Sequence, residues 1–558
     1  MAVRKHTVKI AMLMAAVTAL PSRAILTWPN CAEVTNANFT AVTLSNRGTD
    51  MTAEPMKMAF DLLAAKTEDA KGKVDVYFTE RLGKVRKFDS KTGKVLTLAT
   101  ISLKIDAGTS SDGVHGIALD PGFKTNHFVY IYYSNLGTTD KAWRVSRFTL
   151  NADHTVLDLA SEVVVLKVPI SGGSKHPGGA LQFDAYGDLW IGTGNDAKTD
   201  DFPTYSSPNT NDLRGKILRI HPTADGKYTI PEGNLFKPGT EKTRPEIYVM
   251  GNRNPYSITL DPVRRWLTWG DVGPDDKDMD GKAINGTGQT MKTEEYDLAT
   301  APGNYGYPFF SGDYQTKSSI NAAAPAMPAN TDWGTSGPGL QTLPPAIAPI
   351  YAYKRACAIT GPIYRYDGDL NSSNKFPPHF TRKWLVTDFN SDNAKITAFT
   401  LNDGGTAITA QENVIGIPLH APEEMQFGPD GALYVINYNG YRSSGPNTAI
   451  IRIDYGGECR PLEPKVETTA TVAIETGGRG LAGKGPQVQV TRASGLLVTV
   501  ATEGAFSLDV RDLSGRLVLS RQAKGPAPIA LSEVRQAGVY FLQVRNAEGE
   551  RSLKIVRD

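Results

Sequence analysis

The chain has 558 residues, too many for one ordinary hydrophobic core, so two or three domains are expected. The formal net charge is only +2 and the charged residues are well mixed, which argues against a nucleic-acid-binding protein. The 54 glycines and 35 prolines, without a long amphipathic helical pattern, indicate a turn-rich all-β protein.

Residues 1–24 have the pattern of an export signal. Three basic residues (Arg4, Lys5 and Lys9) precede an apolar run from Ile10 to Leu20, and Ser22-Arg23-Ala24 forms a small-residue cleavage site. The apolar run is too short to span a membrane, and no later segment is long and apolar enough to do so. We therefore expect a secreted or cell-surface protein that passes through the periplasm in transit.

From about residue 74 an apolar strand, a short Asp/Gly/Pro turn and a second apolar strand recur, within a predicted domain of residues 25–460. The six copies begin at Val74, Gly116, Leu181, Ile258, Trp384 and Met425. Such self-similarity is typical of a β-propeller, so we predict six blades, with residues 25–51 completing a blade or packing on its side. Three long loops, Lys198–Asn211, Asp275–Glu294 and Ser311–Ala348, are expected to build a binding face.

The apolar β pattern stops near Asp454 and resumes near Val488. Residues 461–486 are rich in Thr, Gly and Lys and are interpreted as a linker. Residues 487–558 alternate again and predict a small β-sandwich. The predicted fold class is thus all-β, a six-bladed propeller followed by a small C-terminal sandwich.

Three cysteines allow one disulfide and one free thiol in an oxidising compartment. Cys31 and Cys459 bracket the propeller region, so a bridge between them would join its two ends. Among three possible pairs we prefer this one, which leaves Cys357 free.

The stretch from Ser174 to Asp196 predicts a strand, a tight turn and a returning strand. His176 stands on the loop before the first strand, and Gly178-Gly179 would let backbone or a flat ligand approach closely. Taken alone, such a histidine would more often be a loop residue facing water.

Further motifs accompany this histidine. They are GVHGIALDPGF from Gly113, NDLRGKILRI from Asn211, YVMGNRNPYS from Tyr248, WGDVGPDD from Trp269, TEEYDL from Thr293, GNYGYP from Gly303 and FGPDGALYV from Phe427. Together with HPGG, these motifs resemble the glucose/sorbosone dehydrogenase family, the soluble pyrroloquinoline-quinone (PQQ) sugar dehydrogenases built on a six-bladed propeller. The resemblance spans roughly Val74 to Ile453, with the motifs in family order.

The resemblance implies a set of catalytic and cofactor-binding residues. His176 matches the base that takes the proton of the sugar C1 hydroxyl, a task suited to a neutral imidazole. Arg253 matches the arginine that stabilises charge on the reducing cofactor, and Asn254 matches a cofactor contact. Arg365 falls near a family lysine that pairs with a cofactor carboxylate.

The resemblance also implies two calcium sites. The carbonyls of Gly273 and Pro274 match ligands of the calcium that activates PQQ. Glu295 and the carbonyl of Tyr305 match a second, structural site. The D-x-D-x-D-G run from Asp276 to Gly281 gives only half of an EF-hand loop, and a solvated acidic turn is as good an interpretation as a third site.

Some residues depart from the family pattern. Asn195 stands where the family has the aspartate that orients the histidine, and Ser111-Asp112 stand where Glu or Gln is common. The arginine pair that clamps PQQ carboxylates is replaced by Ala421 and Glu423, and a carboxylate there would repel the cofactor. A divergent subset of secreted proteins shares this acidic version.

The C-terminal segments LDVRDLSGRLVLSRQ and GVYFLQVRNAEGERSLKIV resemble the sorting domain of type IX secretion. That resemblance implies the secretion machinery as a partner. An accessory sandwich that binds sugar is the alternative.

Three functions are compatible with these patterns. The leading hypothesis is an exported oxidoreductase that oxidises a sugar at C1 with PQQ and calcium and passes electrons to an acceptor. The second is a non-catalytic, calcium-stabilised propeller that binds carbohydrate or a surface partner, favoured by Ala421 and Glu423. The third is a calcium-dependent hydrolase or lactonase that keeps His176 as base.

Overall fold

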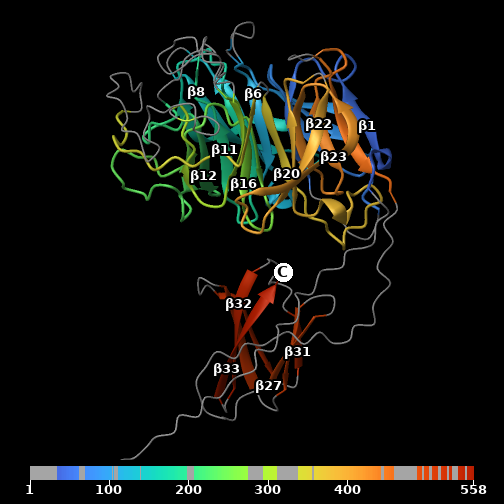
Figure 1. The fold of residues 1–558 in the computed structure, drawn as a ribbon, viewed down its shortest axis with the longest axis vertical. Helices are drawn as coiled ribbons and strands as arrows, with labels where there is room; N and C mark the ends of the chain where they lie inside the picture. The colour runs from blue at the N-terminus through green and yellow to red at the C-terminus, as the bar shows by residue number, and fades with distance from the viewer. Residues whose placement is uncertain are drawn as a thin grey trace, which may run out of the picture.

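Six sheets, each of four to six strands, follow one another in a ring and form the larger part of the computed structural model (Figure 1). The structure describes residues 34–61, 69–103, 105, 111–137, 140–197, 206–273, 293–308, 310, 337–354, 357–391, 393–440, 445–457, 487–492, 496–501, 505–512, 517–524, 527–530, 538–546 and 549–557. The expected signal segment, linker and D-x-D-x-D-G run lie outside these residues, as do Cys31 and Cys459.

Each sheet is one propeller blade, and the first three blades follow in chain order. Blade 1 contains β2 (Pro55–Phe60), β3 (Val76–Glu80), β4 (Lys84–Asp89) and β5 (Lys94–Thr100). Blade 2 contains β6 (Val114–Leu119), β7 (Phe128–Asn135), β8 (Ala142–Leu150) and β9 (Leu157–Pro169), with the short helix α1 (Phe123–Asn126) between its first two strands. Blade 3 contains β10 (Gly178–Phe183), β11 (Leu189–Thr193), β12 (Lys216–Pro222), β13 (Tyr228–Thr229), β14 (Ile247–Met250) and β18 (Gly303–Asn304).

The next three blades complete the ring. Blade 4 contains β15 (Ser257–Leu260), β16 (Leu267–Asp271), β17 (Thr293–Ala299) and β19 (Tyr351–Lys354). Blade 5 contains β20 (Ala358–Ile363), β21 (Lys383–Asp388), β22 (Ala394–Leu401) and β23 (Ile408–Leu419), and the 3-10 helix η2 (Pro378–Phe380) precedes β21. Blade 6 contains β24 (Pro422–Phe427), β25 (Leu433–Asn437), β26 (Ala449–Tyr455) and β1 (Phe39–Asn46), which follows the 3-10 helix η1 (Asn36–Asn38).

Strand β1 closes the ring, because this N-terminal strand pairs antiparallel with β26 at the end of the propeller. The first strands of successive blades contact one another, and β24 contacts β2. The prediction of six blades, with residues before Met51 completing one of them, is confirmed. Such pairing of the two ends of the chain removes the exposed edges of an open arrangement.

The inner strands are buried on both faces, which explains their continuous apolar runs. In β2 (PMKMAF) the first five residues are buried, whereas in the outer strand β23 exposed and half-buried residues predominate. One apolar cluster fills each gap between neighbouring blades; for example, Trp190 of blade 3 and Trp269 of blade 4 belong to the same cluster. The inner strands surround the central channel of the propeller, and this close packing on both of their faces holds them in place.

The C-terminal segment forms two further sheets. One contains β27 (Gln487–Arg492), β28 (Leu496–Ala501) and β31 (Ala527–Ala530). The other contains β30 (Leu517–Lys524), β29 (Ala505–Asp512), β32 (Gly538–Asn546) and β33 (Gly549–Arg557). Two antiparallel sheets agree with the predicted sandwich (Figure 1). Within the described residues, no helix has the length and hydrophobicity needed to span a membrane.

Candidate active site

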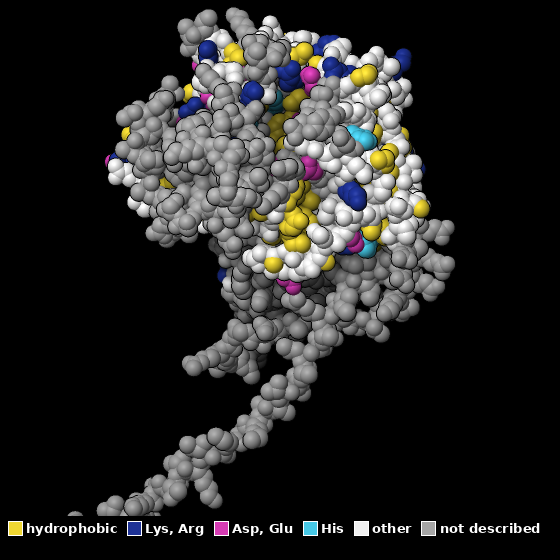
Figure 2. All heavy atoms as spheres, turned by 45° about the horizontal axis from the view of Figure 1, so that its top comes forward, with side chains coloured by type: hydrophobic (Ala, Val, Ile, Leu, Met, Phe, Trp, Pro, Cys, Tyr) yellow, Lys and Arg dark blue, Asp and Glu magenta, His cyan; other side chains and the backbone are white. Residues whose placement is uncertain are grey.

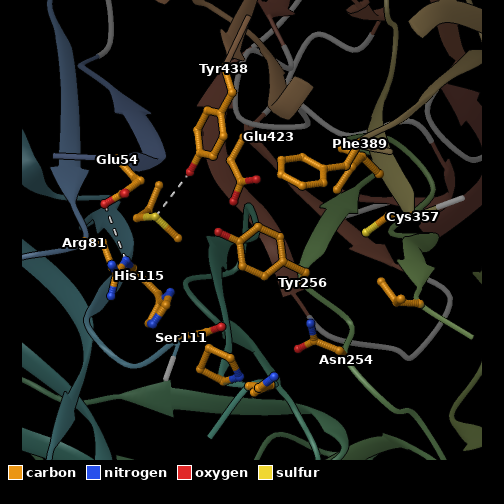
Figure 3. Close-up of a pocket in the computed structure, with 15 residues that line it drawn as sticks. Glu54, Arg81, Ser111, His115, Asn254, Tyr256, Cys357, Phe389, Glu423 and Tyr438 are labelled. Carbon is orange, nitrogen blue, oxygen red and sulfur yellow. Dashed lines mark hydrogen bonds and ion pairs between the residues drawn. The ribbon is translucent and has the colours of Figure 1, made fainter. Parts of the chain in front are cut away.

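A cavity of about 380 Å³ lies at the end of the channel where all six inner strands begin (Figure 3). Every blade contributes to its wall. The lining residues, in blade order, are Glu54, Met56, Arg81, Ser111, His115, Lys175, Pro177, Asn254, Tyr256, Val272, Cys357, Ile359, Phe389, Glu423 and Tyr438. This volume is in the range of small-molecule sites. Figure 2 turns the top of Figure 1 forward and shows a band of apolar side chains there, with acidic and basic side chains beside it.

His176 lies between two residues that line the cavity, directly before β10. Its Nδ1 lies 2.8 Å from the side-chain oxygen of Asn195, and its backbone N–H donates to the hydroxyl of Ser174 at 3.0 Å. An amide oxygen can only accept, so Nδ1 carries the proton and Nε2 is left as a proton acceptor. Gly194 is required beside it, since a Cβ there would lie 2.0 Å from the His176 carbonyl oxygen.

The imidazole of His176 is held in its neutral form. Burial and the positive charges of Arg253 and Lys175 lower its pKa well below 6.5, against a smaller opposite effect of the hydrogen bond with Asn195. Only 5% of the residue is exposed. A buried, neutral and oriented imidazole is suited to general-base chemistry.

Asp271, at the end of β16, positions the predicted cofactor-contacting residues Arg253 and Asn254. Its carboxylate accepts the backbone N–H groups of Arg253 at 2.8 Å and of Asn254 at 2.7 Å. Burial raises the pKa of Asp271 to about 6, and these hydrogen bonds oppose the shift. The side-chain oxygen of Asn254 in turn accepts the N–H of Gly178 at 3.0 Å, which ties the loop of blade 4 to the turn that carries His176.

The predicted calcium ligands lie close to one edge of this site. The N–H of Gly273 donates to Glu294 at 3.1 Å, while Pro274 lies outside the described residues. Glu295 on β17 stands opposite Asp271 on β16. The ring of Tyr305 packs edge-on against Trp269, with centroids 4.6 Å apart.

Asp297, two residues beyond Glu295, is the strongest sign of a cation at the predicted structural site. The side chain is fully buried, and neither carboxylate oxygen has a hydrogen-bond partner within the described part of the chain. Burial, Glu295 and Asp271 all raise its pKa. No three His, Cys, Asp or Glu side chains converge as a metal site in the described ranges, so a cation here would also need backbone carbonyls.

Glu423 points into the cavity as anticipated (Figure 3). The cation Lys57 lies beside it. The ammonium of the fully buried Lys57 lies 3.5 Å from the Glu423 carbonyl and 3.6 Å from the centre of the Tyr256 ring. Burial raises the pKa of Glu423 to about 7, and the charge of Lys57 opposes this. The raised pKa reduces the negative charge of Glu423, and the ammonium of Lys57 compensates the charge that remains. The repulsion that Glu423 would exert on an anionic ligand is therefore weakened.

Arg365 is not brought to the cavity, which contradicts the expectation that it contacts a cofactor carboxylate. Strand β20 begins beside the cavity at Ile359 and runs away from it, so Arg365 lies beyond the opposite end of the strand. There the Arg365 guanidinium binds Asp261, with Nε 2.9 Å from one carboxylate oxygen. The motif match identified a basic residue but did not show at which end of β20 it lies.

Sequence reasoning missed one residue of the cavity wall, His115, and one buried residue behind the wall, Lys57. His115 was noted only within a variant motif, and Lys57 was not singled out. The signal for Lys57 was a lysine inside the apolar run PMKMAF, since a buried lysine requires nearby carboxylates. Cys357 lines the cavity as a free thiol in the described part of the chain, while the predicted bridge between Cys31 and Cys459 lies outside that part and stays a prediction.

Comparisons with known proteins identify the family of this chain. The sequence model "Glucose / Sorbosone dehydrogenase" matches residues 68–443. Quinoprotein glucose dehydrogenase B of Acinetobacter calcoaceticus is 25% identical over 42% of this chain and 48% of its own length. Aldose sugar dehydrogenase YliI of Escherichia coli K12 is 23% identical over 58% of this chain and 74% of its own.

The solved structure of the soluble aldose sugar dehydrogenase of Escherichia coli has the same fold, with a TM-score of 0.50, 19% identity and coverage of 75% of this chain and 99% of the other. HIPL2 of Arabidopsis thaliana is 30% identical over 32% of this chain and 26% of its own length. The chain spans less than two thirds of the length of several curated relatives it matches.

Proposed function

The chain belongs to the glucose/sorbosone dehydrogenase family, and we propose that it is an exported enzyme that oxidises the C1 hydroxyl of an aldose with PQQ and calcium. The observation that carries the proposal is that the loops before β10 and β15, in blades 3 and 4, bring His176 together with Arg253 and Asn254 beside one cavity. A general base, a cation and an amide at one cavity are what such an oxidation requires.

The described residues fit an anionic, planar cofactor. Arg81 and Lys175 line the cavity, and Arg253 lies close enough to affect the pKa of His176. Asn254 offers its side-chain NH₂ group as a donor. Bound PQQ would supply the acceptor for the C1 hydride.

The chain's own residues perform the proton chemistry. Oxidation of an aldose at C1 removes a proton from the hydroxyl and a hydride from the carbon, leaving a lactone. Nε2 of His176 accepts the proton, while Asn195 keeps the opposite nitrogen protonated. Arg253 stabilises negative charge that develops beside it.

Two further parts of the proposal concern calcium and export. Asp297, Glu295 and the carbonyl of Tyr305 would hold a structural calcium, and Gly273 with Pro274 a second one next to the cofactor. We assign residues 1–24 to an export signal and the C-terminal sandwich to sorting by type IX secretion, with a secreted or cell-surface destination.

A PQQ titration tests the cofactor assignment. With calcium present, addition of PQQ should give a saturable change in the quinone absorption spectrum, and Arg253→Leu should weaken it at least tenfold. The rival function, a non-catalytic binding propeller, is favoured by Glu423 in the cavity wall. No spectral change with wild-type protein would favour that rival.

A further inference from the structure

His115 is a second imidazole in the cavity wall, and the proposed proton chemistry does not use it. The residue stands at the start of β6, is 1% exposed and lines the cavity. Figure 3 shows it on the same side of the cavity as Ser111 and Arg81, across from Cys357 and Phe389.

Neither ring nitrogen of His115 makes a hydrogen bond of normal geometry within the described part of the chain, although the Ser111 backbone lies close enough to favour the protonated ring. The backbone is nevertheless well fixed, since its carbonyl accepts the hydroxyl of Thr79 at 2.9 Å. The ring meets Tyr132 edge-on, with centroids 6.4 Å apart. A buried polar side chain that is held in place without a hydrogen bond of normal geometry can take its partner from a ligand in the cavity that it lines.

Two glycines of the neighbouring inner strands leave room for the His115 side chain. Gly179, the second glycine of HPGG, has a φ of +115°, and a Cβ there would lie 2.3 Å from the Cβ of His115. A Cβ on Gly116 would lie 2.1 Å from the Gly179 carbonyl oxygen. The two inner strands thus approach each other through glycines at the point where His115 enters the wall.

The charge state of His115 selects the chemistry of that partner. Burial and the positive charges of Lys57 and Arg81 lower its pKa to about 3, against a smaller effect of the Ser111 backbone. A neutral imidazole has one donor and one acceptor. A hydroxyl group matches both, whereas a carboxylate can only accept and is better served by Arg81 and Lys175.

We propose that His115 is a specificity-determining residue that hydrogen-bonds a hydroxyl of the bound sugar other than the one oxidised. This inference rests on the proposed function, because it takes an aldose as the ligand. His176 and His115 then divide the work, one receiving the C1 proton and the other selecting the sugar by a different hydroxyl. Sites that hydrogen-bond a substrate hydroxyl discriminate strongly against analogues without it.

Deoxy sugars provide the test. Binding of D-glucose, D-galactose, D-mannose and D-xylose to the full chain with calcium is measured by calorimetry, followed by the commercially available monodeoxy analogues of the tightest binder. We expect His115→Leu to weaken the parent sugar at least tenfold. One monodeoxy analogue should bind wild-type protein as weakly as the parent sugar binds the His115→Leu variant. For that analogue, His115→Leu should cause no further loss of affinity. His115→Gln, which keeps a donor and an acceptor, should recover part of the loss.

Two controls keep the result interpretable. His379→Leu removes an exposed histidine outside the cavity and should leave all affinities unchanged. The folding of each variant is checked by its melting temperature. If wild type and His115→Leu bind the sugars equally well, or if His115→Leu weakens every analogue equally, the role of His115 is overturned while the proposed function stands. Wild-type protein that binds none of the four aldoses would overturn the proposed function and this inference together.

Discussion

His176 and Asn195 form a hydrogen bond of 2.8 Å between Nδ1 and the amide oxygen, in a place where related motifs have a carboxylate. Both residues are buried. An amide orients the imidazole and fixes its tautomer, but it offers no negative charge to stabilise the protonated ring. The His176 imidazole is therefore well positioned and weakly basic.

Substitution of Asn195 separates orientation from basicity. Asn195→Ala should lower kcat roughly ten- to a hundredfold with a small change in melting temperature, because the ring loses its orienting partner. Asn195→Asp should keep activity and move the acidic limb of the kcat/KM profile to higher pH, because a carboxylate raises the pKa of His176. An unchanged profile in Asn195→Asp would show that this contact does not tune the base.

The neutral His115 makes stability depend on pH. Its pKa is about 3 when folded and 6.5 in a model peptide, so below pH 6.5 the unfolded chain binds more protons and stability falls as pH decreases. Between pH 6.5 and pH 5 this contribution is about 2 kcal/mol. His115→Leu should therefore lose less stability than wild type over this interval, measured by melting temperature at both pH values. Parallel losses would contradict a buried neutral histidine.

Calcium should stabilise the propeller through Asp297. Addition of a chelator should lower the melting temperature of wild-type protein, and calcium should restore it, because a bound cation compensates a buried carboxylate that has no hydrogen-bond partner among the described residues. Asp297→Asn should bind calcium at least tenfold more weakly and show a smaller response. A melting temperature independent of calcium in wild type would exclude this site.

Lys57 should be essential for the packing of blade 6 against blade 1. The backbone N–H of Met58 donates to Glu424, and Lys57 supplies the positive charge that opposes the raised pKa values of Glu423 and Glu424. Lys57→Met should lower the free energy of unfolding by about 3 kcal/mol or more, because it leaves two buried carboxylates without a cation.

Neutralising one of those carboxylates should rescue the Lys57 variant. Lys57→Met/Glu424→Gln should recover part of the lost stability, measured by denaturant unfolding. Lys227→Met, at a lysine whose side chain is 83% exposed, is the matched control and should change little. A Lys57→Met variant as stable as wild type would contradict this account.

The fold could be predicted from the sequence because propeller blades are local hairpins. Four of the six predicted repeats are the first two strands of a blade, such as β10 and β11. The repeats beginning at Val74 and Trp384 are the second and third strands instead, β3–β4 and β21–β22. The inner strands β2 and β20 were missed because an apolar run buried on both faces has no alternation.

The site could be predicted only where a motif fixes both residue type and position. His176, Arg253 and Asn254 follow from short motifs at the entrance of inner strands, and the structure brings them together. Arg365 was wrong because the same motif match does not say at which end of β20 the side chain lies. His115 could not be assigned from sequence, and Lys57 could be recognised only as a lysine within an apolar run, since the charged groups around both come from other blades.

The most direct test is dye-linked oxidation of aldoses by protein reconstituted with both PQQ and calcium. Wild-type protein should reduce the dye with at least one aldose, and the activity should require both additions. His176→Ala should abolish this oxidation while PQQ binding, calcium response and melting temperature remain, because only the proton acceptor is removed. Absence of activity with every aldose, or undiminished activity in His176→Ala, would contradict the account.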